Sequence, residues 1–105
     1  MIDSVLSSDI YTIVSSIPKG KVLSYADVAR LSGKCGPRQV GRILHHNQDN
    51  SKVPCHRVVH EDGTLAPAFA FGGEDAQKKK LQHEGVPFRG ARVHMQKSRW
   101  KTSFS

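Results

Sequence analysis

The chain has little that would suit a membrane or an oxidising compartment. No apolar stretch approaches the ~20 residues that a membrane-spanning helix needs, and no charged start leads into an apolar run as in a secretory signal. Only two cysteines are present, Cys35 and Cys55, and nothing favours a disulfide between them. We therefore expect a soluble protein that is not bound to a membrane. We place it in the cytoplasm, associated with the nucleoid, or in the nucleus if the source is a eukaryote.

The six histidines would be enough for a metal site, but no C-x-x-C pair accompanies them. We therefore expect neither zinc nor any other cofactor. Away from Cys55, we interpret His45, His46 and His60 as surface residues or contacts to a nucleic-acid backbone, and not as metal ligands.

The chain has few acidic residues. It contains 9 Asp and Glu and 16 Lys and Arg, so its net charge is +7. Such an excess predicts attraction to a polyanion, and nucleic acid is the polyanion that it favours. A basic surface that only keeps the protein soluble would give the same total. The places where the basic residues fall must therefore decide between the two interpretations.

The N-terminal third predicts two helices. Apolar residues three and four apart indicate a helix over residues 4–17, which Pro18 ends. A second helix begins at Ser24, whose hydroxyl can accept from N–H groups of the first turn while Asp27 reaches back. This helix is two to three turns long and ends near Gly33.

A tight turn over residues 34–37 leads into a third helix, from about Pro37 to His46. Two short helices joined by a Gly-containing turn form a helix-turn-helix. One face of the third helix is apolar and the other is basic, as in an element that lies against DNA. Helix pairs also occur for purely structural reasons, so this interpretation depends on the basic face, which carries Arg38, Arg42, His45 and His46.

The rest of the chain predicts shorter elements. They are a strand or extended segment at 53–59, a turn at 61–63, a returning strand from 64–65, an apolar loop at 66–73, a helix at 74–84 that ends at Gly85, and short strands around 92–95. We expect the last strands to lie beside the helix pair as a small wing. The predicted fold class is mostly α with a small β element, a winged helix-turn-helix, in a single domain spanning residues 1–105.

Cys55 allows two interpretations. It can be a small buried hydrophobic residue, as cysteine often is, or a nucleophile, whose reactivity needs the thiolate. Neighbours on a regular strand point to opposite faces, so a straight strand would not pair Cys55 with His56. The segment must bend, or a water must relay the proton, and Pro54 makes a bend plausible.

Several segments resemble the DNA-binding domain of O6-alkylguanine-DNA alkyltransferases and the related alkyltransferase-like proteins. The resemblance covers about residues 5–86 and implies the fold of the family's C-terminal domain. It is carried by the runs IPKGKVLSY at 17–25, RQVG at 38–41, PCHRVV at 54–59 with Asn47 ahead of it, GG at 72–73 and LQHEG at 81–85.

The resemblance implies a role for each matching residue. Cys55 would take the alkyl group from guanine O6, His56 would draw off the thiol proton through a water, Glu84 would orient His56, and Asn47 would brace the turn. Tyr25 would push at the neighbouring phosphate and favour rotation of the nucleotide, and Arg38 would enter the duplex where the lesion base has left. DNA contacts would come from Tyr25, Arg38, Gln39, Gly41, Arg42 and Arg57. The lesion pocket would be lined by Pro54, Val58, Phe69, Phe71, Gly72 and Gly73.

Two departures from the family pattern matter. We expect the N-terminal domain of full alkyltransferases to be absent, as in alkyltransferase-like proteins, which lack the reactive cysteine and flag the lesion for excision repair. The loop before Gly72 also differs from the family's Gly-Tyr-x-Gly-Gly pattern, being longer and more apolar. This difference predicts a pocket that accepts bulkier alkyl groups.

Three hypotheses therefore stay open for a protein that we expect to be a monomer. The first is irreversible transfer of an alkyl group from double-stranded DNA carrying O6-alkylguanine to Cys55. The second is lesion recognition without transfer, with nucleotide excision repair proteins as partners. The third is a general basic DNA-binding module in which Cys55 only packs.

Overall fold

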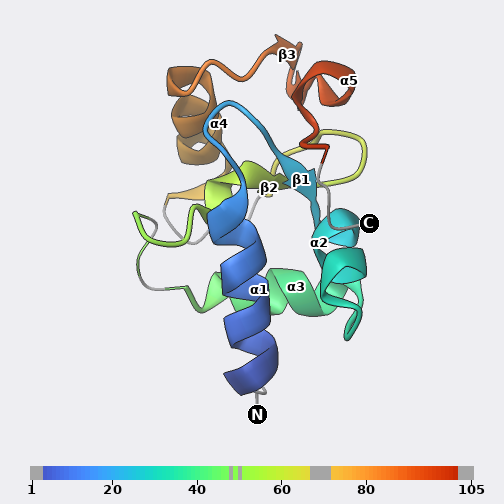
Figure 1. The fold of residues 1–105 in the computed structure, drawn as a ribbon. Coiled ribbons are helices and arrows are strands. Elements are labelled where there is room, and N and C mark those ends of the chain that lie inside the picture. Colours follow the sequence, from blue (N-terminus) through green and yellow to red (C-terminus); the bar gives the residue numbers. More distant parts are fainter. Residues whose placement is uncertain (1–3, 48, 50, 67–71, 102–105) are drawn as a thin grey trace.

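The computed structural model describes all residues except 1–3, 48, 50, 67–71 and 102–105. Its elements are α1 (Ser4–Ser16), β1 (Leu23–Ser24), α2 (Tyr25–Ser32), α3 (Pro37–His45), the single 3₁₀ turn η1 (Cys55–Arg57), β2 (Val58–Val59), α4 (Gly73–His83), β3 (Phe88–Arg89), β4 (Arg92–Val93) and α5 (Met95–Ser98). Helices dominate, and the fold class predicted from the sequence is confirmed (Figure 1). Every helix in the described part of the chain is too short or too polar to span a bilayer.

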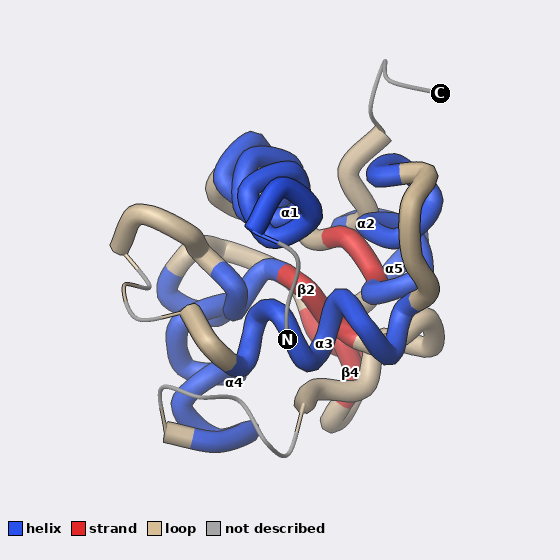
Figure 2. The backbone as a smooth tube through the Cα atoms, turned by 90° about the horizontal axis from the view of Figure 1, so that it is seen from below, coloured by secondary structure: helices blue, strands red, loops and turns tan. Residues whose placement is uncertain are grey.

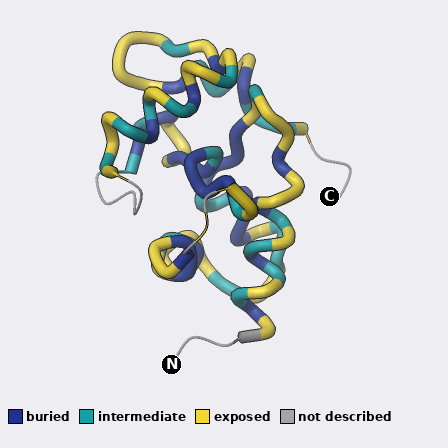
Figure 3. Tube along the Cα trace, turned by 90° about the vertical axis from the view of Figure 1, so that its left-hand side faces the viewer, coloured by how far each residue is buried: buried dark blue, intermediate teal, exposed yellow. Residues whose placement is uncertain are grey.

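A short parallel pair, β1 with β2, lies at the centre of the molecule (Figure 2). On one side, α1, α2 and α3 pack into an apolar cluster that includes Ile10, Val28 and Ile43. On the other side, a second cluster joins Val22, just before β1, and Val59 of β2 to α4 and the C-terminal segment, through residues such as Leu81 and Val93. Buried positions gather in the interior, and exposed ones line the outer faces of the helices (Figure 3). The pair of strands therefore connects the helix-turn-helix to α4.

The predicted start of α2 is confirmed. The Ser24 hydroxyl accepts from Asp27 N–H at 3.0 Å, and the Asp27 carboxylate accepts from Ser24 N–H at 3.0 Å, which forms a complete capping box. Gly33 ends the helix with φ of 67°, a left-handed conformation that glycine adopts at little cost. These local signals fix where the first helix of the pair begins and ends.

The β predictions were wrong in two places. The extended segment expected at 53–59 is a strand only at Val58–Val59, and these residues pair with Leu23–Ser24 instead of with a returning strand at 64–65. The β3–β4 hairpin lies at the α4 end of the molecule, far from α3 (Figure 1), and the strand expected around 92–95 ends at Val93. The hairpin buries Val93 in the second apolar cluster, which holds it away from the helix pair.

Replacing Ser24 with alanine should lower the free energy of unfolding by about 1 kcal/mol, because an N–H in the first turn of α2 loses its acceptor. Urea unfolding followed by circular dichroism measures the effect. Ser8→Ala on the exposed face of α1 is the matched control and should change stability little. Equal losses in the two variants would show that the capping box contributes nothing.

Candidate functional site

Cys55 lies on a bend that Pro54 initiates. Pro54 has φ of −77° and ψ of 69°, and Cys55 N–H donates to the Val53 carbonyl at 2.7 Å, which is an inverse γ-turn. Arg57 N–H then donates to the Pro54 carbonyl at 2.9 Å and closes the 3₁₀ turn. The predicted strand does not form here, because the Pro54 ring fixes φ and proline has no backbone N–H to donate to a neighbouring strand. The bend that would let Cys55 and His56 act together is therefore present.

Asn47 holds this bend from the side of α3. Its side-chain amide donates to the Val53 carbonyl at 2.9 Å and to the Cys55 sulfur at 3.6 Å. Its side-chain oxygen accepts from Asp49 N–H at 3.1 Å. Asn47 and Cys55 are both buried, so these contacts are shielded from water. The geometry is that expected of a residue that braces the turn.

His56 and Glu84 also come together, from η1 and from the end of α4. His56 Nε2 lies 3.1 Å from Glu84 Oε2, and both side chains are buried. Burial lowers the pKa of His56, and although Glu84 opposes this, Arg57 and Lys80 add to the lowering. The imidazole is therefore neutral near pH 7, which leaves it able to accept a proton.

Arg57 occupies a different place from the one its sequence motif suggested. Its guanidinium donates twice to the Glu84 carboxylate, from Nε at 3.0 Å and from Nη2 at 2.6 Å, and once to the Ile17 carbonyl at 2.8 Å. Burial alone would raise the pKa of Glu84, but the hydrogen bonds and charges of Arg57 and His56 lower it overall. These contacts favour an internal positioning role for Arg57 over a contact to DNA.

Tyr25 lies at the first turn of α2, half-buried between Gly41 and His60. Its ring is 5.2 Å from the His60 ring, between centroids, and a Cβ on Gly41 would be 3.7 Å from it. Burial, and after it the nearby Cys55, raises the pKa of Tyr25 to about 12. The phenol therefore stays protonated and can donate a hydrogen bond to an anion.

The exposed face of α3 is polar and basic. Val40, Ile43 and Leu44 are buried against α1 and α2. The opposite face presents residues that the sequence predicted as contacts to DNA: Arg38, Gln39 and Arg42, followed by His45. Gly41 lies beside Tyr25 and not on that open face.

Of the residues predicted to line a lesion pocket, Pro54 and Val58 are buried beside Cys55 along the chain. Gly72 precedes α4 with φ of 116°, and Gly73 opens it with φ of 79°. Both conformations are left-handed and favour glycine. Phe69 and Phe71 lie outside the described residues.

Gln77 is a site residue that the sequence did not reveal. It is fully buried on α4, and its amide nitrogen donates to the His56 carbonyl at 3.1 Å and to the Val58 carbonyl at 3.0 Å. Its oxygen accepts from Ala66 N–H at 2.9 Å. Gln77 therefore connects the turn that carries Cys55 to the start of the loop predicted to cover the lesion. In the sequence, Gln77 lies four residues before the apolar Leu81 and so shares its helix face. A polar amide on that apolar face is the signal that could have identified Gln77.

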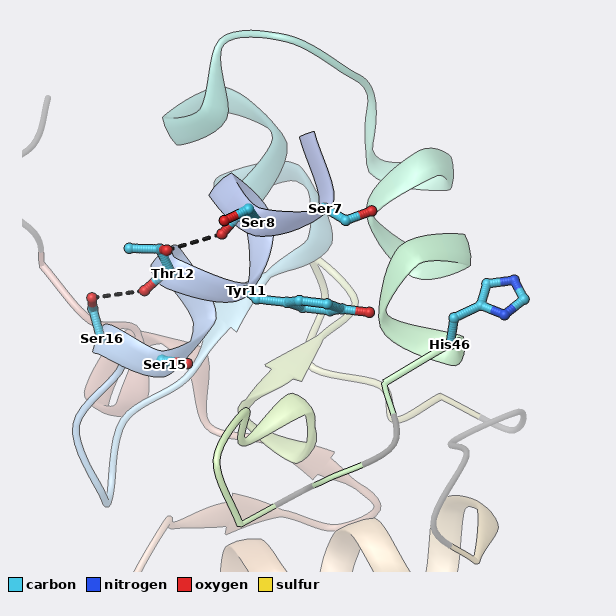
Figure 4. A pocket seen from close by; sticks show the side chains of 7 residues that line it. All are labelled: Ser7, Ser8, Tyr11, Thr12, Ser15, Ser16 and His46. Atoms are coloured by element: carbon cyan, nitrogen blue, oxygen red, sulfur yellow. Dashed lines mark hydrogen bonds between the residues drawn. The ribbon is translucent and has the colours of Figure 1, made fainter. Parts of the chain in front are cut away.

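Tyr11, on α1, is a second residue near the site that the sequence analysis did not identify. A depression of about 730 Å³ runs along α1 and is lined by Tyr11, His46 and serine and threonine hydroxyls (Figure 4). The Tyr11 hydroxyl donates to the Ile43 carbonyl at 3.1 Å, so this side chain ties α1 to α3. Burial, followed by the charge of Cys55, raises the pKa of Tyr11. Cys55 thus lies within electrostatic reach of two tyrosines.

No three His, Cys, Asp or Glu side chains gather as metal ligands among the residues that the structure places. Cys35 and Cys55 are not joined by a disulfide. The described site therefore contains a cysteine beside an amide donor. The next residue in the chain is a histidine, and a carboxylate lies against that histidine.

Comparison with known proteins gives consistent results. Residues 6–86 match the family described as 6-O-methylguanine DNA methyltransferase, DNA binding domain. The chain is 38% identical over 95 residues to the DNA base-flipping protein of Escherichia coli, covering 87% of this chain and 70% of that protein. It is 40% identical over 78 residues to a methylated-DNA–protein-cysteine methyltransferase of Methanothermobacter thermautotrophicus, covering 74% of this chain and 43% of that protein.

A solved structure is similar over nearly the whole chain. The crystal structure of S. pombe Atl1 in complex with damaged DNA containing O6-carboxymethylguanine superposes with a TM-score of 0.82 at 31% sequence identity. The match covers 97% of this chain and 100% of that one. The arrangement of the helices is therefore that of a protein solved on DNA.

Replacing Gln77 with leucine should lower the free energy of unfolding by about 3 kcal/mol, because two buried carbonyls and one N–H lose their partner. Gln82→Leu, at an exposed position of the same helix, is the control and should stay close to the natural protein. Chemical denaturation of the three proteins tests this. Similar midpoints for both variants would contradict the positioning role of Gln77.

The lowered pKa of Glu84 predicts how stability depends on pH. Because the folded-state pKa lies below the ordinary value of 4.5, the contribution is present above pH 4.5 and is lost as pH falls through the folded-state pKa. In Glu84→Gln, unfolding at neutral pH should be easier and the loss on acidification shallower. Asp49 and Asp62, whose pKa values are also lowered, titrate in both proteins, so the difference isolates Glu84. Parallel stability curves would contradict the assignment.

Proposed function

The chain belongs to the family of 6-O-methylguanine DNA methyltransferase DNA-binding domains, and from this we propose that it repairs alkylated DNA directly. In this proposal it binds the minor groove of double-stranded DNA through α3, turns an O6-alkylguanine out of the duplex and transfers the alkyl group irreversibly to Cys55. The observation that carries the proposal is the buried Cys55 sulfur 3.6 Å from an amide donor of Asn47, with the linked pair His56 and Glu84 next to it.

The proton transfer follows from the placement of His56 against Glu84. His56 Nε2 lies 3.1 Å from Glu84 Oε2, so a proton on Nε2 would face the carboxylate and leave Nδ1 with the lone pair, which can take the Cys55 proton through a water. The neutral state that the lowered pKa of His56 gives this ring is the one that a base needs. The Asn47 N–H then faces a sulfur anion, which it stabilises more than a neutral thiol.

The transfer itself balances without a cofactor. The Cys55 thiolate attacks the alkyl carbon, so an S–C bond forms while the C–O6 bond breaks and its electron pair stays with the guanine. The guanine takes up one proton, which matches the proton lost by the thiol. The thioether is not reversed by any group in the site, so each protein molecule reacts once.

The base must leave the helix because its O6 alkyl carbon is stacked within the duplex. Tyr25, held as a neutral phenol by a pKa of about 12, can approach a backbone phosphate without charge repulsion. Arg38, exposed at the start of α3, can fill the place that the base leaves. The basic face of α3 contacts phosphates, so affinity should fall with salt and depend little on sequence.

A second function is recognition of the lesion without transfer, with nucleotide excision repair proteins as partners. The likeness to S. pombe Atl1 across 97% of the chain favours it, as does the named E. coli base-flipping relative. The two functions share the same DNA face and flipped base. They differ in whether Cys55 gains the alkyl group.

Incubation with an excess of duplex carrying O6-methylguanine, followed by intact mass measurement, should show one methyl group added per protein, located on the peptide that contains Cys55. Cys55→Ser should abolish this gain and still bind the modified duplex more tightly than the unmodified one. Cys35→Ser, which alters the partly buried thiol between α2 and α3, should retain transfer.

The outcomes separate the alternatives. Tight lesion binding with no mass gain would reject alkyl transfer and support recognition alone. Equal affinity for modified and unmodified duplex would reject both functions and leave a general DNA-binding module.

A further inference from the structure

We propose that the depression behind His56 is a binding site for a phosphate group. It has a volume of about 430 Å³ and is lined by Lys19, His56, Lys79, Lys80, His83 and Glu84. It lies at the α4 end of the molecule, whereas α3 lies at the opposite end (Figure 1). A DNA duplex on α3 would therefore leave this depression open.

The charges around the depression favour an anion. Among the residues that the structure describes, no carboxylate pairs with Lys19, Lys79 or Lys80. Glu84 is the one acid in the lining, and its carboxylate already accepts from Arg57 at 2.6 and 3.0 Å. Lysine ammonium groups are compact charges that bind phosphate without demanding a fixed orientation. Their surplus positive charge is what a phosphate would neutralise.

The carboxyl end of a helix attracts cations, which alone could account for the basic residues of α4. It does not account for Lys19, which comes from the turn after α1. That turn is held against the end of α4, because Arg57 Nη1 donates to the Ile17 carbonyl at 2.8 Å and the backbone at Gly20 approaches the Glu84 carbonyl closely. Lys78, in contrast, lies over the Phe88 ring at 5.6 Å, outside the depression.

A phosphate in this position would act on His56, whose buried ring forms part of the lining. The charged groups that act on this ring are Glu84, Arg57 and Lys80, and the lining of the depression also holds Lys19, Lys79 and His83. An added anion favours the imidazolium, so binding should raise the pKa of His56 from its lowered value. If the proposed alkyl transfer uses neutral His56 as its base, phosphate would then slow transfer. This last step rests on the proposed function, but the binding does not.

Titration of the natural protein with inorganic pyrophosphate, followed by NMR of the histidine rings at constant ionic strength, tests the site. The His56 and His83 signals should shift and saturate, and the pH midpoint of the His56 titration should move upward. The double variant Lys19→Gln, Lys80→Gln should bind about tenfold more weakly, because two charges near the anion are lost. Lys78→Gln, which removes one charge from the same helix outside the depression, should bind like the natural protein.

Two further arms distinguish the source of the phosphate. Adenosine 5′-monophosphate presents a free phosphate monoester, and a lesion-free duplex presents backbone phosphodiesters. Shifts of His56 and His83 that depend on Lys19 and Lys80 would support the site with whichever source produces them. Absence of saturation with all three probes, or equal weakening in Lys78→Gln and the double variant, would overturn it. None of these readouts requires alkyl transfer, so the proposed function can fail without affecting the result.

Discussion

The carboxylate of Glu84 is the contact on which the geometry of the site depends. It accepts two hydrogen bonds from Arg57 and lies 3.1 Å from His56 Nε2. Arg57 also donates to the carbonyl of Ile17, so one buried charge joins α4, η1 and the end of α1. A buried carboxylate without these partners would carry a large desolvation cost. The three segments are therefore held in one arrangement, and the orientation of the His56 ring follows from it.

Two neutral amides fix the rest of the turn around Cys55. Asn47 donates to the Val53 carbonyl on one side, and Gln77 donates to the His56 and Val58 carbonyls on the other. Neutral side chains can hold the backbone without adding charge, so the pKa of His56 is set first by its burial and then by Glu84, Arg57 and Lys80. Gln77 also accepts from Ala66 N–H, so this one side chain joins Ala66 to the turn that carries Cys55. Backbone geometry and proton affinity are thus controlled by separate residues.

The sequence predicts those parts of the fold that local chemistry specifies. The capping box of Ser24 and Asp27, the left-handed end at Gly33 and the start of α3 at Pro37 each depend on residues within one turn. The pairing of Leu23–Ser24 with Val58–Val59 joins segments 35 residues apart, and no local pattern marks it. For the same reason Arg57 looked like a DNA contact. Its partner Glu84 is 27 residues away, and the residues next to Arg57 in the sequence do not indicate which carboxylate compensates its charge.

The charge cluster cannot by itself distinguish alkyl transfer from lesion recognition, because it holds the turn in either case. The two proposals differ at residue 55, because lesion recognition without transfer does not require a hydrogen-bond donor to the sulfur at this position. Here the Asn47 amide directs one N–H to the Val53 carbonyl, which is sufficient to hold the bend, and lies 3.6 Å from the sulfur as well. The second contact adds little to a neutral thiol but stabilises a thiolate. We therefore favour alkyl transfer because of the contact between the Asn47 amide and the Cys55 sulfur, and not only because the motif contains a cysteine.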